Sequence, residues 1–469
     1  MITSMTTSSI VRRATCLAAV TTLLVPTLRT SPAQAVPSDS AIRAIIKTRV
    51  DSGRGPGIVV GVLDHGQRRY YAYGSAGTGS APLDEHTLFE IGSISKTFTA
   101  LLLADAVTRG EVRLDQPVAD LLPPGTAVPS KDGKQITLEL LSMHRSGLPR
   151  LPSNMSPANP TDPYADYDAT RLKAFLASYA LKRAPGDSAE YSNFGAGLLG
   201  YALTLRSGMP SWGALVERRI TGPLGMRETY VDVPASLAAR VATGHNEALA
   251  PVPAWHLDAL AGAGALRSTA ADMLTYLAAE LDTTSGPLHK AVQLGRTPRA
   301  PFLSGMRIAL GWLVTGQPSQ PLWWHDGGTG GFRSFVAFDP SRQLAVVVLA
   351  NSALGPDDIG MHIMNPLVPV VMPMVPPRTI ATVAPALLDR LVGEYPLMPN
   401  MVLTITQSGG TLFGQATGQG KFPLTPATPT RFVFTPSGID IEFHLDDAGR
   451  AKEMVFRQGG GSLTVQRKP

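Results

Sequence analysis

The order of β-forming and helical runs along the chain restricts the folds that it can adopt. Two β-rich runs over 57–74 meet at His65-Gly66, which predicts a hairpin. Four further runs follow one another over 307–350, and the residues from 101 to 290 are mostly of helical pattern. Strands at both ends with helices between them predict an α+β domain, in which strands distant in sequence complete an antiparallel sheet.

Capping residues and helix breakers locate several of the expected helices. Residues 38–52 have an amphipathic pattern, with Ser38 or Asp39 as the N-cap. The pattern within 136–152 predicts a helix that is stopped by Gly147 and Pro149. A short extended run over 86–92 leads directly into an apolar helix.

The C-terminal part of the chain has a different character. Residues 356–385 are rich in proline, and their apolar runs are too short and too often broken to predict a membrane-spanning helix. We therefore expect a packed linker there. From 386 onward, eight short candidate strands separated by turn-forming residues predict a small all-β meander barrel.

The N-terminus has the features of an export signal. Arg12 and Arg13 precede an apolar core over 14–25 that is too short to span a bilayer comfortably. Ala33-Gln34-Ala35 then offers a site for signal peptidase, so we expect cleavage after Ala35. The mature protein would be periplasmic or secreted, without a stable membrane span. The general secretory and twin-arginine routes both stay open.

A chain of 469 residues is too long for one compact core. The expected organisation is a signal peptide over 1–35, a main domain over 36–355, a linker over 356–385 and the barrel over 386–469. The sequence leaves the oligomeric state open.

Composition excludes several kinds of chemistry. The one cysteine, Cys16, lies in the expected signal, so the mature chain has no thiol for a nucleophile, a disulfide or a zinc–thiolate site. Removing the signal lowers the formal charge from +5 to +2, which does not favour a nucleic-acid partner. The nine histidines are scattered, and no phosphate-binding or dinucleotide motif is present. We therefore expect neither a metal nor a cofactor.

Ser93 and Lys96 form the first candidate catalytic motif. Their spacing places them one turn apart on one helix face, and the apolar run that follows indicates that this helix is buried. A serine at a helix start, with free N–H groups nearby and a lysine as base, suits nucleophilic catalysis. A chain of this length contains about one S-x-x-K by chance, so the motif needs support from elsewhere.

Two further motifs supply that support. Tyr191-Ser192-Asn193 stands between a Gly/Pro loop and an apolar helix. Taken alone, it also fits an ordinary N-cap. His325-Asp326-Gly327 ends an expected strand, where glycines allow close approach of a ligand or of backbone. Taken alone, it also fits a glycine-rich hairpin with an incidental histidine.

The three motifs in this order resemble those of the serine β-lactamase and penicillin-binding DD-peptidase superfamily. The closest resemblance is to the class C β-lactamase-like branch with its esterase relatives, in which the third motif is K-T-G or a variant such as H-x-G. The segments "SGLP", "PLGM" and "GGTGGF" add to the likeness, which covers about residues 40–355. It implies a β-lactamase/transpeptidase-like antiparallel sheet flanked by helices, with a mostly helical insertion. The region 386–469 resembles the lipocalin-like barrel that some members append.

The resemblance also implies roles for the motif residues. Ser93 would be the acylated nucleophile, and Lys96 its base with a depressed pKa. Tyr191 would shuttle a proton to the leaving group together with Lys96. Asn193 would hydrogen-bond the substrate and Lys96.

The remaining implied residues lie on the opposite wall of the cleft. His325 and Gly327 would contact the substrate there. The backbone N–H groups of Ser93 and Gly328 would form the oxyanion hole.

The substrate is the open point. His325 stands where class C β-lactamases have a lysine that attracts the substrate carboxylate, and an imidazole attracts it less. The alternatives are a β-lactamase or D-alanyl-D-alanine carboxypeptidase, an esterase of small acyl esters, and a penicillin-binding or peptidoglycan-sensing protein that turns over slowly. In each case the partner is a small molecule or a peptidoglycan fragment.

Overall fold

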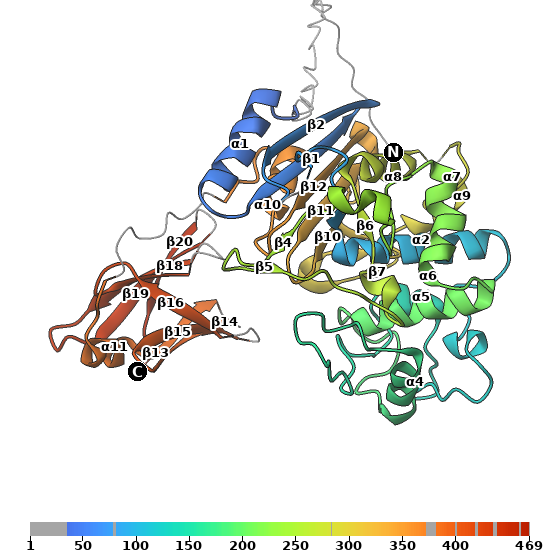
Figure 1. Ribbon diagram of the computed structural model, residues 1–469. Helices are drawn as coiled ribbons and strands as arrows, with labels where there is room; N and C mark the ends of the chain where they lie inside the picture. The colour runs from blue at the N-terminus through green and yellow to red at the C-terminus, as the bar shows by residue number, and fades with distance from the viewer. Residues whose placement is uncertain are drawn as a thin grey trace, which may run out of the picture. The chain divides into compact units, whose positions relative to one another are not determined.

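The computed structural model describes residues 35–77, 81–282, 284–371, 381–398, 401–417, 421–434, 439–458 and 461–468. Residues 1–34 of the expected signal peptide, Cys16 among them, lie outside the described residues. The expected fold class is confirmed: an antiparallel sheet flanked by helices, followed by a β-barrel (Figure 1).

The main sheet has eight strands in the order β2-β1-β12-β11-β10-β9-β8-β7. Pairing of β1 with β12, in which Val60 lies opposite Val348, joins the two strand groups that are distant in sequence. The hairpin at His65-Gly66 is present between β1 and β2. The strands are β1 (Gly57–Asp64), β2 (Gln67–Gly74), β7 (Ala300–Pro301), β8 (Arg307–Ile308), β9 (Leu313–Thr315), β10 (Leu322–Gly328), β11 (Arg333–Asp339) and β12 (Leu344–Ala350).

Alternating residues of the central strands bury their side chains on opposite faces of this sheet. Val60 of β1 and Val348 of β12 belong to one core, with residues of α1 (Asp39–Asp51) and α10 (Asp357–Met364). Val59 and Val347 belong to the other core, with residues of α2 (Ser95–Thr108), α5 (Asn193–Ser207) and α8 (Ala270–Leu281). Burial of both faces explains the nearly continuous apolar sequences of β1 and β12.

The caps of the helices follow the sequence closely. Ser38 caps α1, and Asp168 caps α4 (Ala169–Ser178). The other helices are α3 (Leu138–Ser142), α6 (Trp212–Val216), α7 (Gly222–Leu224) and α9 (His289–Gly295). The helix expected from 136 to a stop at Gly147 and Pro149 is shorter than predicted, because α3 ends at Ser142 and the backbone turns left-handed at His144.

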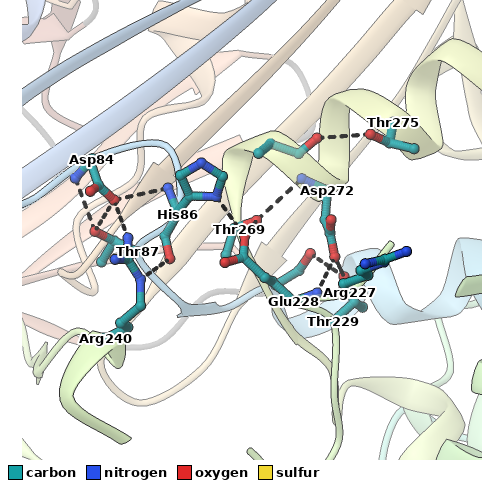
Figure 2. A network of polar contacts seen from close by, with 12 residues as sticks. Asp84, His86, Thr87, Arg227, Glu228, Thr229, Arg240, Thr269, Asp272 and Thr275 are labelled. Atoms are coloured by element: carbon teal, nitrogen blue, oxygen red, sulfur yellow. Dashed lines mark hydrogen bonds and ion pairs between the residues drawn. The ribbon is translucent and has the colours of Figure 1, made fainter. Parts of the chain in front are cut away.

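Polar contacts fix the segment that leads to Ser93. β3 (Phe89–Glu90) pairs with β6 (Arg267–Ser268). Before β3, Asp84 accepts hydrogen bonds from the His86 N–H and from Arg240, at 2.9 and 2.6 Å. His86 Nδ1 lies 2.7 Å from Glu228 Oε2, and the Glu228 N–H donates to Asp272 of α8. Figure 2 shows this chain of contacts from the loop before β3 to the first turn of α8.

The segment expected to be a linker, 356–385, begins with structure. Its residues 357–364 form α10, whose Ile359 and Ile363 are fully buried against the main sheet. This part of the expected linker is therefore packed against the main sheet. Among the described residues, no helix is long and apolar enough to cross a membrane.

The C-terminal region forms the expected barrel. Eight strands pair in sequence order, and the Lys468 N–H donates to Glu394 O at 2.8 Å, which brings the last strand to the first. The region expected to be all β also contains a helix, α11 (Pro385–Leu391), whose Leu388 and Leu391 join the barrel core. The strands are β13 (Gly393–Met398), β14 (Met401–Ser408), β15 (Thr411–Ala416), β16 (Phe422–Pro426), β17 (Arg431–Phe434), β18 (Ile439–Leu445), β19 (Ala451–Gln458) and β20 (Gly461–Gln466).

Candidate active site

Ser93 sits at a sharp turn between β3 and α2. Gly92 opens a short 3-10 turn with φ of +48°, a conformation that favours glycine. A Cβ at this position would lie 2.6 Å from the N atom of Gly328, so the missing side chain also allows the end of β10 to approach. The turn leaves Ser93 partly exposed while its neighbours Gly92 and Ile94 are buried.

Lys96 lies one turn after Ser93, as the spacing predicts. Its Nζ is 2.8 Å from Ser93 Oγ and donates to the Ala263 carbonyl at 2.7 Å. The residue is only 3% exposed. Burial, and next the charge of Arg150, lower the pKa of Lys96 to about 7, while Asp326 acts in the opposite direction. The lysine is therefore a base of suitable strength at neutral pH.

Tyr191 reaches the same serine from a different element. Ser192 caps α5 by accepting from the Gly195 N–H at 2.8 Å, so the N-cap interpretation of this motif is correct as well. The cap orients Tyr191 inward, where the centroid of its ring lies 5.0 Å from Lys96 Nζ. Burial raises the pKa of Tyr191, and its hydrogen bond with Ser93 only partly opposes this effect. The phenol therefore stays protonated at neutral pH.

His144 packs against the ring of Tyr191, a contact that no sequence motif predicts. The residue is 2% exposed, and its ring centroid lies 4.3 Å from that of Tyr191. Its carbonyl accepts from the Glu190 N–H at 2.8 Å, and its Nδ1 accepts from the Ser192 N–H at 3.1 Å. Both neighbours of Tyr191 are thus bonded to His144. Burial holds the pKa of His144 well below its usual range, so Nδ1 remains an acceptor.

Asn193 faces the pocket beside Ser93 but does not bond Lys96. Its Nδ2 donates to the Tyr164 hydroxyl at 3.1 Å, and its Oδ1 is buried without a hydrogen-bond partner. The expected bond between Asn193 and Lys96 is not formed. A free buried amide oxygen beside the nucleophile leaves an acceptor for a substrate N–H. The pocket is lined by Ser93, Tyr164, Asn193, Trp255, Leu257, Ala263, Gly264, Gly328 and Thr329.

The end of β10 forms the opposite wall. His325 is 1% exposed, and its ring centroid lies 6.2 Å from that of Tyr191. Its Nδ1 lies 2.6 Å from the Asp326 carbonyl, while its Nε2 is buried without a partner. Burial, and next the charge of Lys96 among the lowering influences, bring the pKa of His325 to about 4. The imidazole is therefore uncharged at neutral pH.

Gly327 and Gly328 differ in position. A Cβ on Gly327 would lie 2.0 Å from the Ile91 carbonyl, so this glycine packs against the end of β3 and does not line the pocket. Gly328 lines the pocket with Ser93, and its N atom packs closely on Gly92. Of the seven site residues that the sequence predicts, the structure brings six together and leaves out Gly327. The six are Ser93, Lys96, Tyr191, Asn193, His325 and Gly328.

Sequence reasoning missed His144, Tyr164 and Trp255. The first lies in the "SMHRSGLP" segment, where a histidine just before a Ser-Gly turn was the available signal. The other two come from loops without a pattern that points to the site. Within the described ranges, no group of three or more potential metal ligands comes together.

Comparisons with known proteins bear on this geometry. A family model described as "Beta-lactamase" matches residues 42–363. The chain is 30% identical over 346 residues to a beta-lactamase of Escherichia coli (strain K12), which covers 66% of this chain and 88% of that protein. It is 31% identical over 323 residues to the D-alanyl-D-alanine-carboxypeptidase/endopeptidase AmpH of the same strain, covering 64% and 80%.

Solved structures agree with the family match. A class C beta lactamase from Rhodobacter sphaeroides has a TM-score of 0.58 at 29% identity, over 69% of this chain and 97% of that one. A beta-lactamase/D-alanine carboxypeptidase from Pseudomonas syringae shares the fold, with a TM-score of 0.61 at 23% identity, over 71% and 99%. The family model spans well over half of the sequence, and the chain therefore belongs to the beta-lactamase family as a serine hydrolase of the β-lactamase and D-alanyl-D-alanine carboxypeptidase type.

Proposed function

We propose that the protein cleaves amides or esters through an acyl-enzyme on Ser93. The observation that carries this proposal is the contact of 2.8 Å between Lys96 Nζ and Ser93 Oγ, at a lysine whose pKa burial lowers to about 7. Neutral Lys96 accepts the Ser93 proton while Oγ attacks the acyl carbon. The N–H groups of Ser93 and Gly328 stabilise the oxyanion, a contribution of about 3–4 kcal/mol per donor.

Tyr191 completes the proton path in this proposal. Collapse of the tetrahedral intermediate breaks the bond from the acyl carbon to the leaving nitrogen or oxygen. Tyr191 donates its proton to that atom and regains one from Lys96, so the net result is one proton moved from Ser93 to the leaving group. A water molecule then hydrolyses the ester on Ser93, which releases the acid and restores the serine. The phenol is suited to act as the acid because its raised pKa keeps it protonated.

The proposed substrates are D-alanyl peptides and β-lactams, as the names of the relatives suggest. The free Oδ1 of Asn193 supports an amide substrate, since it can accept an N–H next to the acyl group. Small acyl esters are the second candidate. The uncharged His325 favours them, because it offers no charge to the carboxylate of a β-lactam.

One panel tests these alternatives. The mature protein and a Ser93→Ala variant are compared on a chromogenic cephalosporin, a D-alanyl-D-alanine peptide and a short-chain nitrophenyl ester. Mass spectrometry after penicillin treatment should show an acyl adduct on Ser93. An adduct that persists without product would identify a slowly turning-over penicillin-binding protein. Equal activity of both proteins on every substrate, with no adduct, refutes the proposal.

We further propose export with cleavage after Ala35, and an independent main domain and barrel. The basic and apolar segments of the first 35 residues support export, and the separate apolar core of the barrel supports the division. The N-terminal sequence of protein recovered from a bacterial periplasm should begin at Val36. A start at Met1 in exported material would contradict cleavage.

A further inference from the structure

The wall formed by β10 offers the substrate no positive charge. His325 occupies the place of the expected cation, yet it is 1% exposed with a pKa of about 4. Arg333, on the neighbouring strand β11, packs its guanidinium over Gly328. Its guanidinium donates to the Thr329 carbonyl at 3.5 Å and lies near Asp357, a carboxyl group whose pKa burial raises to about 7 and the charge of Arg333 in part lowers.

Arg150 is a cation beside the Tyr191 ring, and among the described residues its side chain is not paired with an acidic group. Its carbonyl accepts from the N–H groups of Asn193 and Phe194 at 3.0 and 3.3 Å, which anchors the residue to the start of α5. Its guanidinium carbon lies 5.2 Å from the centroid of the Tyr191 ring. The side chain is exposed, and it makes no hydrogen bond or ion pair with another residue in the part of the chain that the structure describes.

The position of this guanidinium relates it to the leaving group. In the proposed function Tyr191 donates its proton to the leaving atom, so the leaving group lies beside the Tyr191 hydroxyl. A carboxylate on a C-terminal amino acid is two bonds from the leaving nitrogen. The Arg150 guanidinium, which lies against the ring of the same tyrosine, is within reach of that carboxylate. Arginine binds carboxylates with two parallel hydrogen bonds.

We propose that Arg150 binds a carboxylate on the leaving group, so that the preferred substrates are acyl amides that end in a free carboxylate. This inference rests on the proposed function for the position of the leaving group. The positive charge that binds the substrate carboxylate therefore comes from Arg150, at the end of the segment 146–150, and not from β10. Arg150 is a specificity-determining residue in this assignment, because it contacts the substrate away from the reacting atoms.

A matched pair of substrates tests the assignment. An N-acyl-D-alanyl-D-alanine and the same peptide with a C-terminal amide are compared for the wild type, Arg150→Gln and Arg150→Lys. Measurements at pH 9 keep Lys96 deprotonated in all three, so the charge of Arg150 does not act through the lysine. Lys173→Gln, which removes an exposed lysine of α4, controls for net charge.

The wild type should favour the acid over the amide by about 10- to 100-fold in kcat/KM, chiefly through KM. Arg150→Gln should bring this ratio close to one, and Arg150→Lys should retain part of it because a lysine is a point charge. Lys173→Gln should keep the wild-type ratio. A wild type without preference for the acid, or an Arg150→Gln variant that keeps the wild-type ratio, overturns the assignment.

A binding measurement separates this inference from the proposed function. The Ser93→Ala variant, with and without Arg150→Gln, is titrated calorimetrically with the acid and with the amide. Tighter binding of the acid that disappears with Arg150→Gln supports the assignment even if the wild type cleaves neither peptide, which would count against the proposed function alone. Equal affinities for the acid and the amide in Ser93→Ala overturn it.

Discussion

The ring of His144 packs against the ring of Tyr191 with 4.3 Å between centroids, and His144 bonds the residues on both sides of this tyrosine. The backbone of His144 is left-handed, with φ of +56°, which is uncommon for a residue other than glycine. Such a conformation persists where the surroundings over-determine it. We infer that His144 positions Tyr191 toward Ser93.

Replacing His144 tests this positioning role. His144→Asn keeps a side chain that tolerates left-handed backbone but removes the ring that supports Tyr191. We expect kcat to fall by about 100-fold, since a displacement of roughly 1 Å at a catalytic group has that effect. Steady-state kinetics with a substrate from the panel, together with a thermal melt, measure the change.

A double-mutant cycle distinguishes positioning from a loss of fold. In a Tyr191→Phe background, His144→Asn should lower kcat by far less than it does alone, because the group that it positions is already absent. Full additivity of the two effects on kcat would show that His144 does not act through Tyr191.

The pKa of Lys96 predicts the acid limb of the pH profile. Because Lys96 must be deprotonated to accept the Ser93 proton, kcat/KM for an uncharged ester should rise as pH increases through about 7. Arg150→Gln removes a charge that lowers this pKa, so the limb should move to higher pH. Asp326→Asn removes a charge that raises it, so the limb should move to lower pH. Shifts of both variants in one direction would refute Lys96 as the titrating base.

His325 should remain neutral where most histidines titrate. Its pKa of about 4 reflects burial, so the C2–H NMR resonance of His325 should stay constant from pH 8 to pH 5.5 and shift only below that. Assignment follows from the resonance that is absent in His325→Asn. A midpoint between pH 6 and pH 7 would mean that this side chain carries charge near neutrality.

The sequence predicted best where local pattern and burial agree. Alternating apolar residues and turns located all eight barrel strands, and strands distant in sequence complete the main sheet as expected, through the pairing of β1 with β12. Helix α11 was missed because it is only seven residues long and follows the proline-rich segment; its Leu388 and Leu391 are fixed by packing in the barrel.

Tertiary contacts account for the errors at the site. The helix expected to stop at Gly147 ends earlier because His144 gains a ring contact and two hydrogen bonds with the Tyr191 segment, which is distant in sequence. Asn193 bonds Tyr164 instead of Lys96 for the same reason, since no local pattern places the Tyr164 loop over the site. The contact between Ser93 and Lys96 was predicted by their spacing alone, because the two residues lie one helical turn apart.

Gly92 and Gly110 form a matched pair for the last prediction. Both have positive φ, +48° and +72°, so alanine at either position costs roughly 1–2 kcal/mol of backbone strain. Nothing lies within 4 Å of a Cβ at Gly110, whereas one at Gly92 would lie 2.6 Å from the N atom of Gly328. Gly110→Ala should therefore lower the free energy of unfolding and leave kcat unchanged.

Gly92→Ala should lower stability further and also move the Gly328 N–H away from the Ser93 N–H. Loss of one oxyanion donor costs about 100- to 1000-fold in kcat, so we expect a decrease in that range for Gly92→Ala. Chemical denaturation and single-turnover kinetics on both variants separate the two effects. If Gly92→Ala kept full kcat while losing stability, the contact between Gly92 and Gly328 would serve packing and the oxyanion hole would lie elsewhere.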